Sequence, residues 1–173
     1  MTRSVVSLDD LTVNNVGTFK KITDVVLPTS YPQQWYKDSI DHIVKLAYFS
    51  ELPVGAIKAK AINFSGQTRE NIALLPPQGL DTPKILPNAL YIELLAVLAA
   101  YRGQGVGSAL LQYVLSEAKK RFIHEVVLHV SVDNKNAIEW YVKMGFVKGD
   151  VVKDYYKEQG LENPDAVIMR TLV

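Results

Sequence analysis

A glycine-rich stretch is the first part of this sequence whose residue types could do chemistry. The residues Arg102-Gly103-Gln104-Gly105-Val106-Gly107-Ser108 stand between an apolar run and the expected start of a helix. Glycines let a ligand approach the backbone closely, and the N–H groups at a helix N-terminus attract anions. The stretch therefore predicts a cradle for a pyrophosphate group, and a glycine-rich turn without a ligand explains the same residues equally well.

Two common phosphate motifs are excluded by these residues. A P-loop continues into Gly-Lys-Ser or Gly-Lys-Thr, and no such triplet follows here. A dinucleotide-binding fingerprint places its third glycine at a different spacing and has an acidic residue at the end of the following strand, which this sequence lacks.

Two polar side chains interrupt apolar runs on either side of this stretch. His129 stands within Val126–Val130, a run typical of a buried strand, so its imidazole needs a polar partner. Tyr91 lies near the start of another apolar run, and its hydroxyl has the same need. A core histidine with a satisfied hydrogen bond is the commoner explanation from spacing alone, but an imidazole can also accept a proton near neutral pH.

The elements that must position these residues are clearest in the second half of the chain. Strand and helix patterns alternate there, which predicts a right-handed parallel crossover and an α/β sheet covered by helices. The expected strands are Leu90–Leu98, Glu125–Val132, Val147–Val152, Tyr155–Tyr156 and Ala166–Val173, and the expected helices are Ser108–Arg121 and Asn134–Met144.

The first half has weaker signals. Apolar spacing predicts a helix from Val16 to Val26, prolines bracket a turn from Pro28 to Pro32, and a short helix is expected over Gln33–His42. Two β-leaning runs, Lys45–Phe49 and Val54–Ile62, predict a hairpin. Asn63–Asn88 carries four prolines and predicts a long excursion between two strands.

Length and composition limit the class of protein. A chain of 173 residues predicts a single domain over 1–173, and 48% hydrophobic with 21% charged residues is typical of a globular protein. The absence of cysteine excludes disulfides, thiolate metal sites and a cysteine nucleophile. A net charge of +1, no long apolar run and no secretion signal predict a cytoplasmic protein that binds neither nucleic acid nor membranes.

Together these motifs resemble a known family. Arg102-x-x-Gly105-x-Gly107 is similar to the acetyl-CoA pyrophosphate loop of the GNAT superfamily of N-acetyltransferases. The segment from Asn134 through Tyr141 to Phe146 resembles the second coenzyme motif of that superfamily. The resemblance implies a single GNAT domain with an α/β fold, in which a mixed central β-sheet with splayed parallel middle strands is flanked by helices.

The resemblance also implies acetyl-CoA as co-substrate, without a metal. Strand N–H groups around Leu95–Val97 would stabilise the charge that develops on the thioester carbonyl oxygen. Tyr141 would lie near the departing sulfur, or else only pack beneath Phe146. The implied coenzyme-binding residues are Leu95, Ala96, Val97, Arg102, Gly103, Gln104, Gly105, Val106, Gly107, Ser108, Asn134, Ala137, Tyr141 and Lys143.

One branch of the superfamily is closer, namely the San-type catalytic subunit of N-terminal acetyltransferase E. The similar stretches are Leu27–Tyr31, Leu46–Phe49, Leu90–Ile92, Leu128–Val130 and Tyr155–Lys157. By motif position this branch implies that Tyr91 and His129 act together as the base, directly or through a water. A free α-amino group, with a pKa of about 7.7–8.0, needs such a base near neutral pH.

The branch further implies how a substrate enters. A protein N-terminus that keeps its methionine, followed by an apolar residue, would lie between the Leu27–Tyr31 turn and the Tyr155–Tyr156 hairpin. The implied substrate-binding residues are Leu27, Pro28, Thr29, Tyr31, Tyr155 and Tyr156. Leu27 replaces a common Phe and Glu93 replaces an apolar residue. Because Glu93 stands two residues beyond Tyr91, we expect it on the same face, beside the incoming amine.

Other functions remain open from the sequence. A GNAT enzyme that acetylates lysine side chains or small amines is one alternative, and a coenzyme-binding subunit without activity is another. The branch also implies docking on the auxiliary and catalytic subunits of the NatA complex at the ribosome.

Overall fold

The computed structural model describes residues 5–27, 31–64, 72–74, 87–156 and 162–173. The chain divides into two compact units, one of Met1–Lys60 with Ile92–Ser116 and the other of Ala61–Tyr91 with Glu117–Val173. Strands β3 (Leu52–Phe64) and β5 (Ala89–Val97) contribute residues to both units. The single domain expected from the chain length stays a prediction.

In the first unit, hydrogen-bonded strands follow the order β1, β2, β3 and β5. The pairs β1–β2 and β2–β3 are antiparallel, and the β2–β3 pair confirms the predicted hairpin. The other elements of this unit are β1 (Val6–Asp10), α1 (Val16–Val26), α2 (Gln33–Asp38), the 3₁₀ turn η1 (Ser39–Asp41), β2 (Ile43–Phe49), the 3₁₀ turn η3 (Ala99–Tyr101) and the start of α3 (Val106–Lys120).

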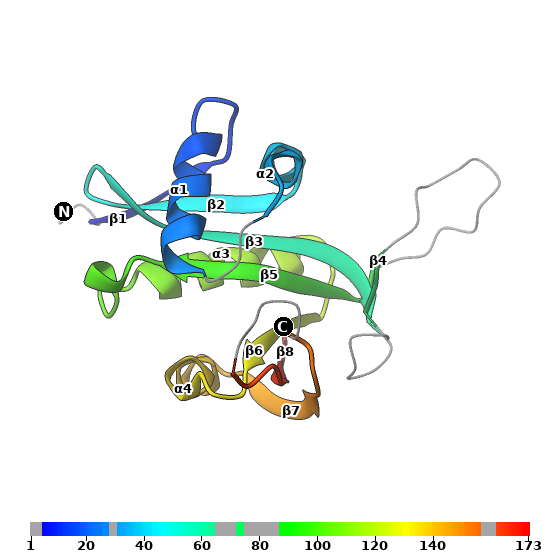
Figure 1. Cartoon of the computed structure of the whole chain (residues 1–173). Helices are drawn as coiled ribbons and strands as arrows, with labels where there is room; N and C mark the ends of the chain where they lie inside the picture. The colour runs from blue at the N-terminus through cyan, green and yellow to red at the C-terminus, as the bar shows by residue number, and fades with distance from the viewer. Residues whose placement is uncertain (1–4, 28–30, 65–71, 75–86, 157–161) are drawn as a thin grey trace. The chain divides into compact units, whose positions relative to one another are not determined.

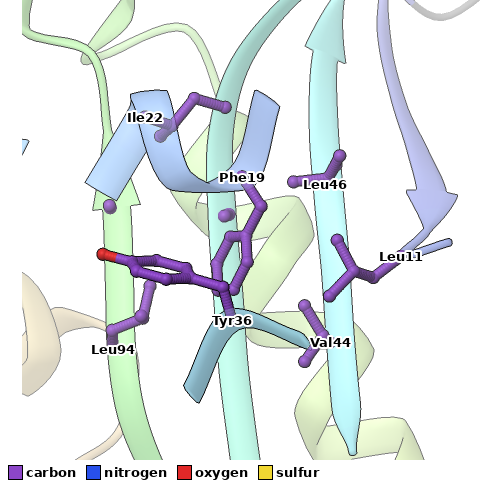
Figure 2. Packing of buried hydrophobic residues seen from close by; sticks show 9 residues of the cluster. Leu11, Phe19, Ile22, Tyr36, Val44, Leu46 and Leu94 are labelled. Carbon is purple, nitrogen blue, oxygen red and sulfur yellow. The ribbon is translucent and has the colours of Figure 1, made fainter. Parts of the chain in front are cut away.

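Helices α1 and α2 lie on the same side of β2 and β3 (Figure 1). Their apolar side chains meet those of the strands in one buried cluster, where Phe19 and Tyr36 are fully buried and lie edge to face, 5.7 Å apart. Figure 2 shows these rings between the helices and the strands, with Leu46 and Leu94 pointing toward them. Burying side chains of this size stabilises the fold by about 1.5–3 kcal/mol each.

The other side of β3 is approached by α3 at a glycine. A Cβ atom on Gly55 would lie 2.9 Å from the carbonyl oxygen of Ala96 and 3.1 Å from a methyl group of Val106. Such a short separation is not tolerated, so glycine at this position allows β5 and the first turn of α3 to approach β3 closely.

The second unit has the strand order β5, β6, β8 and β7. The pair β5–β6 is parallel, while β8 lies between β6 and β7 and is antiparallel to both. This mixed arrangement with flanking helices confirms the predicted α/β sheet. The remaining elements of the unit are β4 (Ile72–Leu74), β6 (Glu125–Ser131), α4 (Lys135–Lys143), β7 (Val147–Val152) and β8 (Ala166–Leu172).

Two short strands were not predicted, and one predicted strand was wrong. A strand, β1, precedes the first helix, and its regular pairing with β2 rather than its composition defines it. The expected excursion at Asn63–Asn88 contains β4, which pairs with the end of β3. Tyr155–Tyr156 lies in a turn instead of a strand, because Asp154 adopts a positive φ of 57° and bends the chain.

Candidate active site

The parallel register of β5 and β6 places Tyr91 and His129 on one face of the second unit. Tyr91 pairs with Val127, and His129 stands two residues further along β6, so the two side chains point to the same side. The Tyr91 hydroxyl lies 2.9 Å from Nδ1 of His129. Tyr91 is buried and His129 is half-buried, so the polar partner that each residue was predicted to need is the other.

Tyr155 completes this group from the turn after β7. Its hydroxyl lies 2.7 Å from the Tyr91 hydroxyl, and its ring stacks on the His129 imidazole with centroids 4.1 Å apart and planes 11° from parallel. Two hydrogen bonds hold the turn: the Asp154 N–H donates to the Asp165 side chain at Oδ1, 2.9 Å away, and the Tyr156 N–H donates to the Pro164 carbonyl at 2.8 Å.

This arrangement can hold and move a proton. The Tyr91 hydroxyl can donate to Nδ1 of His129 while it accepts from the Tyr155 hydroxyl, which forms a continuous chain of three groups. The stacked Tyr155 ring also fixes the plane of the imidazole, and the Tyr156 hydroxyl donates to the His129 carbonyl at 3.4 Å. A phenol that is hydrogen-bonded to an imidazole in this way is suited to general acid–base chemistry.

The second coenzyme segment also lies in this unit. The Asn134 side chain accepts a hydrogen bond from the Ala137 N–H at 3.2 Å and caps α4, a role that suits its residue type. Tyr141 is buried against Phe146, with ring centroids 5.3 Å apart. Burial and the nearby Tyr156 raise the pKa of Tyr141, so its hydroxyl stays protonated and can donate a hydrogen bond. Lys143 is exposed near the end of the helix.

The glycine-rich stretch lies in the first unit, between η3 and α3. Gly103 and Gly105 have φ values of 76° and 85°, and a Cβ atom at either position would meet nothing within 4 Å. The backbone is therefore left-handed at both glycines and open to a ligand. Arg102 is exposed and its Nε donates to the Val97 carbonyl at 3.2 Å, which ties the start of the loop to the end of β5.

The other predicted coenzyme-binding residues of the loop and of the end of β5 differ in how far they are exposed to solvent. Gln104 is exposed, Val106 is buried, and Gly107 and Ser108 are half-buried in the first turn of α3. Along β5, Ala96 is buried while Leu95 and Val97 are half-buried.

The predicted substrate turn is described at its two ends. Leu27 follows α1 and packs against the buried cluster of the first unit, as does Tyr31. The Tyr31 ring stacks on Trp35 with centroids 4.0 Å apart. Pro28 and Thr29, which were also predicted to bind substrate, lie outside the described residues.

Glu93 has lysine partners on β3. Its Oε2 lies 3.1 Å from Nζ of Lys58, and its Oε1 lies 3.0 Å from Nζ of Lys60. An incoming ammonium would have to compete with both lysines for this carboxylate, so its expected contact with the amine stays a prediction. Lys58 was missed by the sequence analysis, although a lysine inside the apolar run Val54–Ile62 was a visible signal.

The Glu93 carboxylate and the Leu94 side chain both reach the side of the strands on which α2 packs. Leu94 packs in the cluster beneath α1 and α2, and Glu93 reaches Lys58 on that same side, where Lys58 contacts Trp35 of α2. In a regular strand, consecutive side chains point to opposite faces. The prediction that Glu93 lies on the same face as Tyr91 rests on this alternation and stays a prediction.

Residues 22–146 match the acetyltransferase (GNAT) family. The chain belongs to this family. The match spans both coenzyme segments and the Tyr91–His129 pair, which confirms the resemblance on which the sequence analysis relied.

Two curated relatives that align with nearly the whole chain show to which branch of the family this acetyltransferase belongs. It is 34% identical to the probable N-acetyltransferase san of Drosophila melanogaster, over 99% of this chain and 84% of that protein. It is 32% identical to N-alpha-acetyltransferase 50 of Danio rerio, over 95% of this chain and 87% of that protein. The San-type branch predicted from the sequence is thereby confirmed.

A solved structure agrees with this placement. Arabidopsis thaliana Naa50, in complex with the bisubstrate analogue CoA-Ac-MVNAL, has a TM-score of 0.76 and 31% identity to this acetyltransferase, and the alignment covers 97% of this chain and 99% of that one. Among the described residues of this acetyltransferase, no cluster of His, Asp or Glu side chains could hold a metal ion. No helix in the described part is long and apolar enough to span a bilayer.

Proposed function

We propose that this enzyme transfers the acetyl group of acetyl-CoA to the α-amino group of proteins that keep their initiator methionine before an apolar residue, with Tyr91 and His129 as the base. It is an N-terminal acetyltransferase, as its relatives over nearly the whole chain are. The observation that carries the proposed mechanism is the 2.9 Å contact between the Tyr91 hydroxyl and Nδ1 of His129, with Tyr155 bonded to the same hydroxyl.

The base is needed because the substrate amine is mostly protonated at neutral pH. An α-ammonium group has a pKa of about 7.7–8.0, so one proton must leave before nitrogen can attack a carbonyl carbon. In the proposed mechanism, the Tyr91 hydroxyl accepts this proton, directly or through a water, as its own proton passes to Nδ1 of His129. Such catalysis typically accelerates a reaction by about 10²–10⁴.

The residues around the glycine-rich stretch fit a pyrophosphate group. Gly103 and Gly105 leave open space over a left-handed backbone, and the first N–H groups of α3 follow directly. Arg102 is exposed beside them and can add a charge-assisted hydrogen bond. When bound, acetyl-CoA supplies the acetyl group as an activated thioester. The proposed role of Tyr141 is to donate a hydrogen bond to the departing sulfur, which its raised pKa permits.

The proposed preference for methionine rests on one solved relative and on the apolar side chains of Leu27 and Tyr31. The analogue bound to Arabidopsis Naa50 carries the peptide MVNAL, which begins with methionine and a second apolar residue. Leu27 and Tyr31 pack on the buried cluster of the first unit, so they are held by the core and can present apolar surface to a methionine side chain.

A peptide panel tests the proposal. Peptides that begin with Met-Leu, Met-Lys, Ser-Glu and Ala-Ala, and an N-terminally blocked peptide with an internal lysine, would be acetylated with acetyl-CoA and analysed by mass spectrometry. We expect Met-Leu to be acetylated most efficiently, on its α-amino group. Preferred acetylation of Ser-Glu or of Ala-Ala would contradict the methionine preference, and acetylation of the internal lysine alone would contradict N-terminal specificity.

The partners and the location extend this proposal. We propose that the enzyme works in the cytoplasm and docks on the subunits of a NatA complex, as the San-type branch implied. Affinity purification of the full chain from cells, with ribosome fractions compared before and after salt washing, would detect this association. Recovery of the chain without any NatA subunit would contradict it.

A further inference from the structure

A buried lysine that the proposed mechanism does not use lies in the first unit. Lys58, in the middle of β3, has a side chain that is only 1% exposed. Its Nζ lies 3.1 Å from Glu93 Oε2 and 3.6 Å from the centroid of the Trp35 ring. The ammonium group is thus enclosed by a carboxylate from β5 and an indole from α2.

Burial of an ammonium group needs strong compensation. Desolvation lowers the pKa of Lys58, and Glu93 is the largest opposing influence, with Asp38 at the end of α2 a weaker one. Lys60 shares the Glu93 carboxylate at 3.0 Å. The Trp35 ring offers a face to the cation, an interaction that strengthens when water is excluded. The Lys58 ammonium on β3 therefore contacts both a carboxylate of β5 and an aromatic ring of α2.

The Trp35 ring contacts a residue at the end of the predicted substrate turn. Trp35 stacks on Tyr31 with centroids 4.0 Å apart and planes 11° from parallel. Trp35 also contacts Phe19 and Tyr36, at 5.9 Å and 5.0 Å between centroids. Tyr31 also lies edge to face with Tyr36, 6.3 Å between centroids, and packs on the buried cluster, so the stacked Trp35 ring is one of the contacts that position it.

We propose that Lys58 is a positioning residue for the peptide substrate. The Lys58 ammonium, anchored by Glu93, fixes the plane of Trp35 and through it the Tyr31 ring, against which the first residue of the substrate binds. This inference rests on the proposed function, in which Tyr31 contacts the peptide. It assigns Lys58 no contact with the substrate and no part in proton transfer.

The test compares steady-state constants of the full-length enzyme with a Met-Leu peptide. Lys58→Met keeps the length of the side chain and removes the charge, whereas Lys58→Arg keeps a cation that can stack on Trp35 and pair with Glu93. Lys45→Met is the matched control, since Lys45 also joins a carboxylate, Asp10, and an aromatic ring, Tyr113 at 5.0 Å, away from the substrate turn.

We expect Lys58→Met to raise the KM for the peptide about tenfold, with kcat and the KM for acetyl-CoA changed less than about twofold. Lys58→Arg should keep the peptide KM close to the wild-type value, and Lys45→Met should leave it unchanged. A second readout needs no turnover: the two tryptophans are Trp35 and Trp140, so in a Trp140→Phe background the emission of Trp35 reports peptide binding. Lys58→Met should weaken that binding by the same factor.

The outcomes separate this inference from the proposed function. If Tyr31→Ala leaves the peptide KM unchanged, the proposed peptide site is wrong, and the inference that depends on it is wrong too. If Tyr31→Ala raises the KM but Lys58→Met does not, the peptide site stands and the positioning role of Lys58 is overturned. A Lys58→Met variant in which kcat falls and both KM values rise to the same extent would also overturn it. If Lys58→Met fails to fold, Lys58→Gln, which also removes the charge but keeps a polar side chain, is tested by the same criteria.

Discussion

The Tyr91 hydroxyl lies 2.9 Å from Nδ1 of His129, so a residue of β5 and a residue of β6 share one hydrogen bond across the parallel pair. We expect Tyr91→Phe and His129→Ala each to lower kcat by about 10²–10⁴, because each removes a group needed to take the proton from the amine. The KM for acetyl-CoA should remain within about twofold, since neither change touches the glycine-rich loop. Steady-state kinetics with a Met-Leu peptide measures both constants, and the double variant should lose little more than either single one. Additive losses would indicate two independent roles.

Tyr155 provides a finer test of the same group. Tyr155→Phe keeps the ring stacked 4.1 Å from His129 but removes the hydroxyl that lies 2.7 Å from Tyr91. We expect kcat to fall about tenfold, which is the effect of losing one hydrogen bond that orients Tyr91. Tyr156→Phe is the control, because the Tyr156 hydroxyl reaches the His129 backbone only at 3.4 Å, and its kcat should change less than about twofold. An equal loss in both variants would argue against a special role for the Tyr155 hydroxyl.

Arg102 is expected to affect coenzyme binding alone. Arg102→Ala removes an exposed cation beside Gly103 and Gly105, as well as the hydrogen bond to the Val97 carbonyl. We expect the KM for acetyl-CoA to rise about tenfold while kcat at saturation falls less than about twofold, as for the loss of one charge-assisted contact to phosphate. Desulfo-coenzyme A or coenzyme A binding by calorimetry gives an independent measure. A fall in kcat without a change in KM would contradict this assignment.

Much of this site was visible in the sequence because its signals are local. The cap at Asn134, the limits of α1 and the left-handed glycines of the loop depend on residues within one or two turns of each other. The pairing of Tyr91 with His129 was implied by motif position, and the register of β5 on β6 supplies its geometry.

The features that the sequence did not predict depend on distant partners. Lys58 and Glu93 lie on different strands, so only the fold reveals that the lysine inside an apolar run is paired. The same holds for β1, which is a strand because β2 pairs with it, and for the turn at Tyr155, which Asp165 stabilises from the start of β8. Only the fold shows that the Glu93 carboxylate reaches the side on which Leu94 packs.

The titration of Lys58 predicts how stability changes with pH. Burial lowers the pKa of Lys58 below its ordinary value of 10.5, against the opposing effects of Glu93 and Asp38 and with a smaller contribution from Lys60. The unfolded chain therefore keeps this proton up to a higher pH than the folded chain does. Between the two pKa values, the unfolded state binds more protons, so the contribution of Lys58 to the free energy of unfolding rises with pH.

Urea unfolding of the wild type and of Lys58→Met from pH 7 to pH 10.5 isolates this contribution, because all other groups titrate in both proteins. We expect the difference in free energy of unfolding to be constant near neutral pH and then to shift in favour of the wild type as the pH approaches 10.5. A shift in favour of the variant would mean that pairing with Glu93 outweighs burial and raises the pKa of Lys58.

Two glycines of the first unit should respond to alanine in opposite directions. At Gly55 a Cβ atom would lie 2.9 Å from the Ala96 carbonyl oxygen, so Gly55→Ala forces β3 away from β5 or α3 and should destabilise the fold by about 1–3 kcal/mol. Gly17 lies in α1 with nothing within 4 Å of its Cβ position, so Gly17→Ala should stabilise the helix by up to about 1 kcal/mol. Since 1 kcal/mol corresponds to roughly 2–4 °C in a chain of this size, thermal unfolding resolves both changes. If Gly55→Ala unfolds at the wild-type temperature, β3, β5 and α3 do not pack as closely as described.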